Sequence, residues 1–135
     1  TKENTKLPIF ISLEQDSLKQ DWSNFGKSAF LNCPYGRLIG KFVKKAYEES
    51  LKGISVVLLI PARVDTKFFH NYCSKGEIRF IKGRLKFINR LLPSYREDGN
   101  FKITPAPFPS CIVIFNKDYP PNVKFIDLKD KCNDI

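Results

Sequence analysis

Four consecutive residues in this sequence could do chemistry: Asn32, Cys33, Pro34 and Tyr35. Pro34 fixes its own backbone and has no N–H, so nearby backbone carbonyls stay free to accept hydrogen bonds from another molecule. The Asn32 side chain adds a further acceptor, and Tyr35 adds a flat aromatic ring. Two acceptors beside an aromatic face suit a planar group that carries an exocyclic amine. A rigid turn with Tyr35 packed on a sheet edge would explain the same residues, and the spacing leaves both interpretations open.

The elements on either side of these residues are expected to position them. Residues 28–31 predict a short strand, and residues 37–51 carry apolar side chains at helical spacing, with Gly53 as a stop. The polar face of this expected helix comprises Lys41, Lys44, Lys45, Glu48 and Glu49. The four residues therefore lie at the carboxyl end of a strand, where open α/β sheets bind their ligands.

The rest of the chain predicts an α/β fold in one domain, residues 1–135. Residues 54–60 are nearly all apolar, which indicates a central, parallel strand covered on both faces. The other expected elements are a short aromatic helix after Thr66, strands at 77–81 and 111–115, an extension at 83–87, a loop at 92–109, and no long element after Asn116 because of Pro120 and Pro121. This order favours a doubly wound, mainly parallel sheet with a C-terminal antiparallel strand.

The charge of the chain favours a polyanionic partner. Lysine and arginine number 23 against 14 aspartates and glutamates, which gives a net charge of +9. Nucleic acid is favoured over a membrane surface because no basic amphipathic anchor helix stands out, and a solubilising surface is the alternative. Aromatic residues are interspersed among basic ones within 75–96, which suits phosphate contact and base stacking, although ordinary strands share this pattern.

Other features narrow the class of protein. No apolar run approaches the roughly 20 residues of a membrane span, and no signal peptide is visible. The cysteines are widely spaced and only one histidine is present, so we expect no metal site. Free thiols are typical of an intracellular protein.

The stretch "NCPYG" resembles the Asp/Asn-Pro-Pro-Tyr motif of amino-methyltransferases that use S-adenosylmethionine. Five stretches follow one another in the order, and at about the spacings, of the phage-type DNA adenine-N6 methyltransferase family: "SLEQDSLKQDW", "NCPYGRLIGKFVKKAYEES", "VVLLIPARVDTKFFHNYC", "EIRFIKGRLKF" and "APFPSCIVIF". The resemblance covers roughly Glu3 to Phe115. It implies S-adenosylmethionine as cofactor and a methyltransferase fold.

The resemblance also implies a role for each residue of the turn. An adenine flipped out of the duplex would be the methyl acceptor, with DNA favoured over RNA as the nucleic acid. Asn32 and the backbone carbonyl of Cys33 or Pro34 would accept from the adenine amino group, and Tyr35 would stack on the base. Positioning and electrostatics would be sufficient without a metal. Cys33 replaces the proline that is usual in the family, and its backbone carbonyl is retained.

Five further residues match family positions. Asp16 matches the residue that accepts from the adenine of the cofactor, and Asn4 lies in the segment after the first cofactor motif. Arg63 matches a block that lines the substrate side, while Arg84 and Lys86 match a block suited to phosphate contact.

The assignments of the three basic residues each have a structural alternative. The segment containing Arg63 could instead form a helix cap through Asp65 or Thr66, and Arg84 and Lys86 could lie on a solvated strand edge. Trp22 is expected in the core, and His70 is expected to be an ordinary helix residue.

Two functions follow from these observations. The favoured one is a DNA adenine-N6 methyltransferase. The family's first cofactor motif would precede Thr1, so the domain is expected to be incomplete at its N-terminus. The alternative is therefore a catalytically inactive methyltransferase-like protein that acts as a nucleic-acid-binding or structural subunit of a nucleoprotein assembly. Binding of S-adenosylmethionine separates the two.

Overall fold

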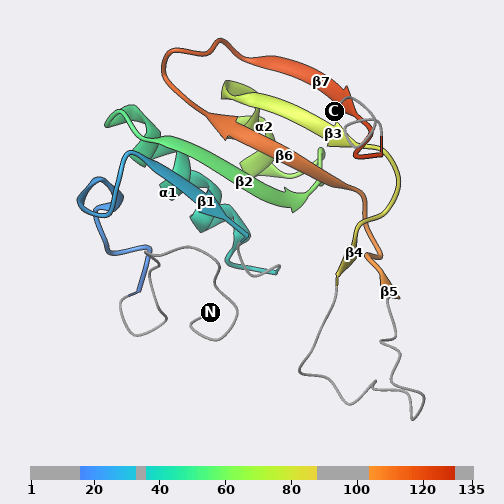
Figure 1. The fold of residues 1–135 in the computed structure, drawn as a ribbon. Helices are drawn as coiled ribbons and strands as arrows, with labels where there is room; N and C mark the ends of the chain where they lie inside the picture. Colours follow the sequence, from blue (N-terminus) through green and yellow to red (C-terminus); the bar gives the residue numbers. More distant parts are fainter. Residues whose placement is uncertain (1–15, 33–35, 88–103, 130–135) are drawn as a thin grey trace.

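The computed structural model describes residues 16–32, 36–87 and 104–129, which form a five-stranded sheet backed by helices (Figure 1). The elements in chain order are η2 (Trp22–Asn24), β1 (Ser28–Leu31), α1 (Ile39–Leu51), β2 (Ser55–Pro61), α2 (Lys67–Asn71), η3 (Cys73–Lys75), β3 (Glu77–Ile81), β4 (Lys86–Phe87), β5 (Thr104–Pro105), β6 (Ser110–Phe115) and β7 (Asn122–Ile126). The predicted α/β class is confirmed. In these ranges no helix is long and apolar enough to cross a membrane.

The strand order is β1-β2-β6-β3-β7, and the sheet is mixed. β1 is parallel to β2, and β3 is parallel to β7. β6 lies between these two pairs and runs antiparallel to both β2 and β3. The five strands of this sheet therefore form two parallel and two antiparallel pairs, in place of a mainly parallel sheet. The interpretation of β2 as an inner strand is confirmed, although only its β1 neighbour is parallel.

Alternation along the strands explains which face the helices cover. In β2, Val56, Leu58 and Ile60 are fully buried, whereas Val57 and Leu59 are half-buried. Figure 1 shows α1 and α2 on the same side of the sheet. Because side chains alternate between the two faces, the buried set faces the helices and the half-buried set faces away from them.

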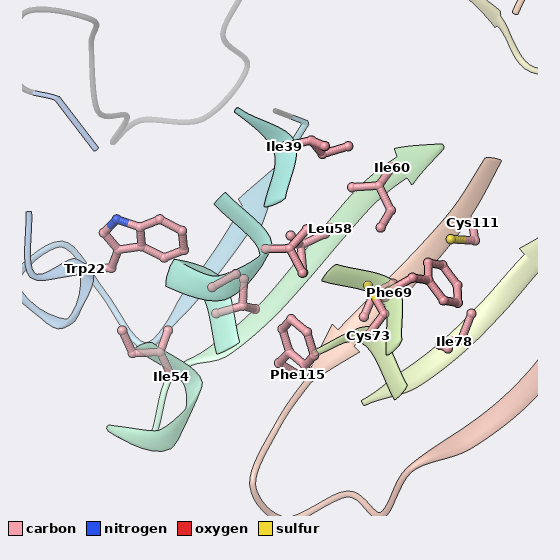
Figure 2. Packing of buried hydrophobic residues seen from close by; sticks show 14 residues of the cluster. Trp22, Ile39, Ile54, Leu58, Ile60, Phe69, Cys73, Ile78, Cys111 and Phe115 are labelled. Carbon is pink, nitrogen blue, oxygen red and sulfur yellow. The ribbon is translucent and has the colours of Figure 1, made fainter. Parts of the chain in front are cut away.

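The core lies between this sheet face and the helices (Figure 2). Val43 and Ala46 of α1 are fully buried, as are Leu58 of β2 and Val113 of β6. Burial of each large apolar side chain stabilises the fold by about 1.5–3 kcal/mol. Trp22 is 5% exposed and belongs to this cluster, as predicted.

The described residues after Asn116 form no element longer than the five-residue strand β7, which follows Pro120 and Pro121 and pairs with β3. Two expectations from the sequence were wrong in detail. β4 does not extend β3; it pairs with β5, which lies in the expected loop. Glu49 is fully buried and not on the polar face of α1.

Candidate functional site

Several strands end at one edge of the sheet. β1, β2, β3 and β7 run in one direction, and β6 runs in the opposite direction. The carboxyl ends of the first four strands therefore share an edge with the start of β6. We call this the carboxyl edge. It collects the chain segments that follow Leu31, Pro61 and Ile81, which are far apart in the sequence.

Asn32 lies at the carboxyl edge, directly after β1, and it is exposed. Cys33, Pro34 and Tyr35 lie outside the described residues, so their predicted roles stay predictions. The chain resumes at Gly36, whose carbonyl accepts from the N–H of Ile39 (3.3 Å) at the start of α1. The expected strand-turn-helix order is confirmed, and the helix begins two residues later than expected.

Arg63 lies at the same edge, just after β2. The N–H of Ala62 donates to the carbonyl of Pro109 (2.8 Å), which ties this segment to the chain preceding β6. Thr66 occupies the N-cap position of α2, as one alternative expected, but its hydroxyl donates to the carbonyl of Arg63 (2.7 Å) and caps no helical N–H. The Arg63 side chain is exposed and forms no ion pair with any described residue.

Arg84 and Lys86 follow β3 at this edge. Gly83 has a φ of +77°, a conformation that favours glycine, and it turns the chain away from the sheet after β3. The N–H of Ala106 then donates to the carbonyl of Leu85 (2.7 Å), which holds the β4-β5 ribbon together. Figure 1 shows this ribbon extending beyond the end of the sheet. Both basic side chains are exposed and unpaired within the described ranges.

One acidic group at this edge is neutralised locally. Asp127 follows β7 and pairs with Lys82 at 3.5 Å. The backbone N–H of Lys129, followed by the Lys82 ammonium, holds the pKa of Asp127 below its ordinary value. Lys82 is therefore compensated, whereas Arg63, Arg84 and Lys86 keep an uncompensated positive charge in the described part of the chain.

Ser110 is a residue of this edge that the sequence did not single out. It is 1% exposed, and its hydroxyl has no hydrogen-bond partner among the described residues. It is paired in register with Pro61 at the end of β2. Buried hydroxyls are normally hydrogen-bonded. The only indication in the sequence was its place immediately before the apolar run of β6.

Asp16 is held in a separate turn. It has a φ of +47°, and its carboxylate accepts from the N–H of Leu18 (3.3 Å) and pairs with Lys19 (3.4 Å). The indole N–H of Trp22 donates to the carbonyl of Ser17 (2.8 Å), which fixes this turn against the core. The carboxylate is 46% exposed, so it can still accept from a ligand. The second predicted cofactor residue, Asn4, lies outside the described residues.

The structure thus brings four of the predicted residues to one edge: Asn32, Arg63, Arg84 and Lys86. An exposed amide and three cations without a carboxylate partner suit a polyanion with a polar base, and they offer no set of metal ligands. In the described part of the chain, no group of three or more histidine, cysteine, aspartate or glutamate side chains could hold a metal ion.

Comparison with known proteins gives an independent result. The family model described as DNA N-6-adenine-methyltransferase (Dam) matches residues 1–131. A DNA N-6-adenine-methyltransferase of Haemophilus phage HP1 (strain HP1c1) is 31% identical over 123 residues, which are 88% of this chain and 65% of the relative. The chain thus spans about two thirds of the length of this relative. No solved structure matches the chain significantly.

Proposed function

The chain belongs to the DNA N-6-adenine-methyltransferase (Dam) family, and from this membership we propose that it methylates the N6 amino group of adenine in DNA. The observation that carries the proposal is the place of the sequence Asn32-Cys33-Pro34-Tyr35, which begins where β1 ends at the carboxyl edge. The proposed partner is DNA, and the proposed location is inside the cell, where DNA is found.

Asn32 is proposed to act directly on the reacting nitrogen. Its side-chain oxygen would accept one hydrogen of the adenine amino group, and the carbonyl of Cys33 or Pro34 would accept the other. These bonds raise the electron density on N6 and hold its lone pair toward the methyl donor. The base must leave the duplex to reach this edge, so a flipped adenine with Tyr35 stacked on it is part of the proposal.

The proposed methyl donor is S-adenosylmethionine, which supplies an electrophilic methyl group on a sulfonium. Asp16 and Asn4 are the residues of this chain that would hold it. The Asp16 carboxylate fits this role because it can only accept hydrogen bonds when ionised, and it is half-exposed. An adenine amino group or a ribose hydroxyl would provide the donors that such a carboxylate requires.

We also propose that the complete fold is doubly wound, as in other methyltransferases of this type. The described helices cover one face of the sheet. The other face carries a half-buried apolar set, namely Val57, Leu59, Ile112 and Ile114. A second covering layer would bury this set. This favours helices on both faces, as doubly wound sheets have.

The proposal is tested by methyl transfer to duplex DNA with the Asn32→Ala variant. We expect turnover to fall about 10²- to 10³-fold, which is the usual cost of removing one preorganised hydrogen-bonding group. The melting temperature should change little because Asn32 is exposed. Asn122→Ala is the matched control, because Asn122 is also exposed but begins β7 at the opposite end of the sheet.

Two outcomes would contradict the proposal. Equal turnover in the Asn32→Ala variant and the unchanged protein would show that the turn does not act on the acceptor. Calorimetry with S-adenosylmethionine provides the second test. Binding is expected, and its absence alongside retained DNA binding would instead favour the inactive nucleic-acid-binding alternative.

A further inference from the structure

A groove lies between α1 and α2, outside the predicted site. It has a volume of about 480 Å³ and is open to solvent along its length. One wall is formed by Arg37, Lys41 and Lys44, and the other includes Lys67, Phe68 and Asn71. The volume falls within the roughly 300–1,000 Å³ that ligand sites occupy. We call it the helix groove.

The helix groove lies where α1 and α2 approach each other near Gly40. A Cβ atom at this position would lie 3.6 Å from the Cβ of Phe68, which is an ordinary contact distance, so the two helices are neighbours here. Phe68 then packs against the core cluster from its position beside Gly40. The result is an apolar floor with longer basic side chains rising along both walls.

The charges in the groove have one sign. No aspartate or glutamate lines it. Lys44 has a weak, exposed partner in Glu48 at 3.9 Å, whereas Arg37, Lys41 and Lys67 form no ion pair with any described residue. All four cations are exposed. Clustered like charges without partners raise the local concentration of an oppositely charged ligand.

The groove is continuous with the proposed active edge. Gly36 and Arg37 line the groove beside the start of α1, and they follow directly after the Asn32-Cys33-Pro34-Tyr35 sequence. Lys67 is the first residue of α2, and it lies four residues after Arg63, which follows the end of β2. A strand that presents a base to Asn32 would therefore lead its backbone toward this groove.

We propose that the helix groove binds the phosphodiester backbone of one DNA strand beside the adenine. The inference rests on the proposed function, since that function makes DNA the substrate. Lys41 and Lys44 are three residues apart in α1, so they share one side of the helix, and Arg37 precedes α1 on the same wall of the groove. A row of cations of this kind can contact successive phosphates of one strand. Lys67 adds a cation from the opposite wall.

The test is binding of a fluorescent 20-base-pair duplex by the Lys41→Ala/Lys67→Ala variant, measured at several salt concentrations. Each lost phosphate contact lowers the slope of log affinity against log salt by about 0.9. Two contacts lower the slope by about 1.8, which corresponds to about 60-fold weaker binding at 0.1 M salt. A random duplex should lose as much affinity as one that contains a substrate adenine, because phosphate contacts carry no sequence information.

The Lys27→Ala/Lys117→Ala variant is the matched control. It removes the same charge from exposed lysines at the opposite end of the sheet, before β1 and after β6. We expect its slope to stay close to that of the unchanged protein. Equal losses in the two variants would show that only net charge matters and would overturn the proposal.

Methyl transfer separates this proposal from the proposed function. With saturating DNA, the groove variant should keep its turnover and show a raised KM, because the groove does not touch the reacting nitrogen. If the unchanged protein binds DNA through the groove but transfers no methyl group, the proposed function fails and the groove stands. If the unchanged protein does not bind duplex DNA at all, the groove proposal fails.

Discussion

The two ends of the sheet differ in whether their basic side chains are paired with carboxylates. At the amino end, near the start of β2, the last turns of α1 place Glu49 in the core with 0% exposure. Its carboxylate accepts from Lys45 and Lys52, and from the backbone N–H of Trp22 (3.3 Å). Lys52 also pairs with Asp21 at 3.5 Å. Lys45 and Lys52 are therefore both compensated within the protein.

The same contacts shift the pKa values of Lys52 and Asp21 at the amino end. The hydrogen bond with Glu49 raises the pKa of Lys52 above its ordinary value. Hydrogen bonds from Ser23, with a smaller effect of Lys52, lower the pKa of Asp21. Both shifts favour the charged forms, so each group stabilises the charge of its neighbour.

The carboxyl edge and the helix groove show the contrary arrangement. Arg63, Arg84 and Lys86 at the edge, together with Lys41 and Lys67 in the groove, form no ion pair with the described residues. The contrast is sharpest within α1 itself. Lys45 is 17% exposed and pairs with Glu49, whereas Lys41, one turn earlier, is exposed and unpaired. The paired lysine serves stability, and the unpaired one remains available to a ligand.

The largest predicted effect is the loss of stability when the buried carboxylate of Glu49 at the amino end is removed. We expect Glu49→Ala to lower the free energy of unfolding by about 3 kcal/mol, since it removes the buried partner of two lysines and one N–H. This is the lower end of the usual range because both lysines can reach water. Urea unfolding followed by circular dichroism measures the loss.

Glu48→Ala is the matched control for that change. Glu48 precedes Glu49 on the same helix, is exposed, and pairs with Lys44 at only 3.9 Å. An exposed pair of this kind contributes less than about 0.5 kcal/mol. If both variants lost the same stability, the buried carboxylate would have no special role and the comparison between the two ends would fail.

The second predicted effect concerns DNA binding by the unpaired cations of the carboxyl edge. Arg84→Ala should weaken binding of duplex DNA about 8-fold at 0.1 M salt and reduce the salt slope by about 0.9, without a change in stability. The reason is that Arg84 is exposed and has no described partner to lose. A fluorescence titration over a range of salt concentrations measures both quantities.

Arg84→Lys sharpens this result. It keeps the charge but removes the planar guanidinium, so most of the salt slope should return if phosphate contact is the role of Arg84. Loss of stability in Arg84→Ala, with unchanged DNA binding, would instead place Arg84 with the structural charges of the amino end.

Local pattern was sufficient to predict the elements that lead to the edge. The apolar run of β2 and the helical spacing of α1 predicted both elements within two residues. The order strand-turn-helix then predicted the position of Asn32. These features depend on neighbouring residues along the chain, which is why the sequence alone could reveal them.

Features set by distant pairing could not be predicted in the same way. The mixed sheet depends on the insertion of β6 between β2 and β3, and β7 becomes a strand only because β3 offers it a partner. Glu49 falls on the core side of α1, yet nothing local indicates that the N–H of Trp22, 27 residues away in the sequence, will meet it there. The helix groove also depends on the approach of two separate helices at Gly40.

The smallest effect concerns Glu77, a compensated acid at the start of β3. Glu77 is 8% exposed, accepts from Arg79 at 2.8 Å, and pairs with Lys124 of the neighbouring β7 at 3.2 Å. The hydrogen bond from Arg79, and next that from Lys124, lowers the pKa of the Glu77 carboxyl below its ordinary value. Glu77 therefore forms its ion pair with Lys124 of β7 only while its carboxylate is ionised.

The pH dependence of Glu77→Gln follows from the sign of this shift. A lowered pKa in the folded state means that the stabilisation is fully present above the unfolded pKa of about 4.3, and that it is lost as the pH falls through the folded value. Glu77→Gln should therefore be less stable than the unchanged protein at pH 7, and the gap should close progressively below about pH 4.3. Urea unfolding of both proteins between pH 7 and pH 3 measures the gap. A gap that stays constant over this range would show that Glu77 stabilises the strand pair through packing and not through its charge, and Glu77 would then no longer belong with the compensated charges.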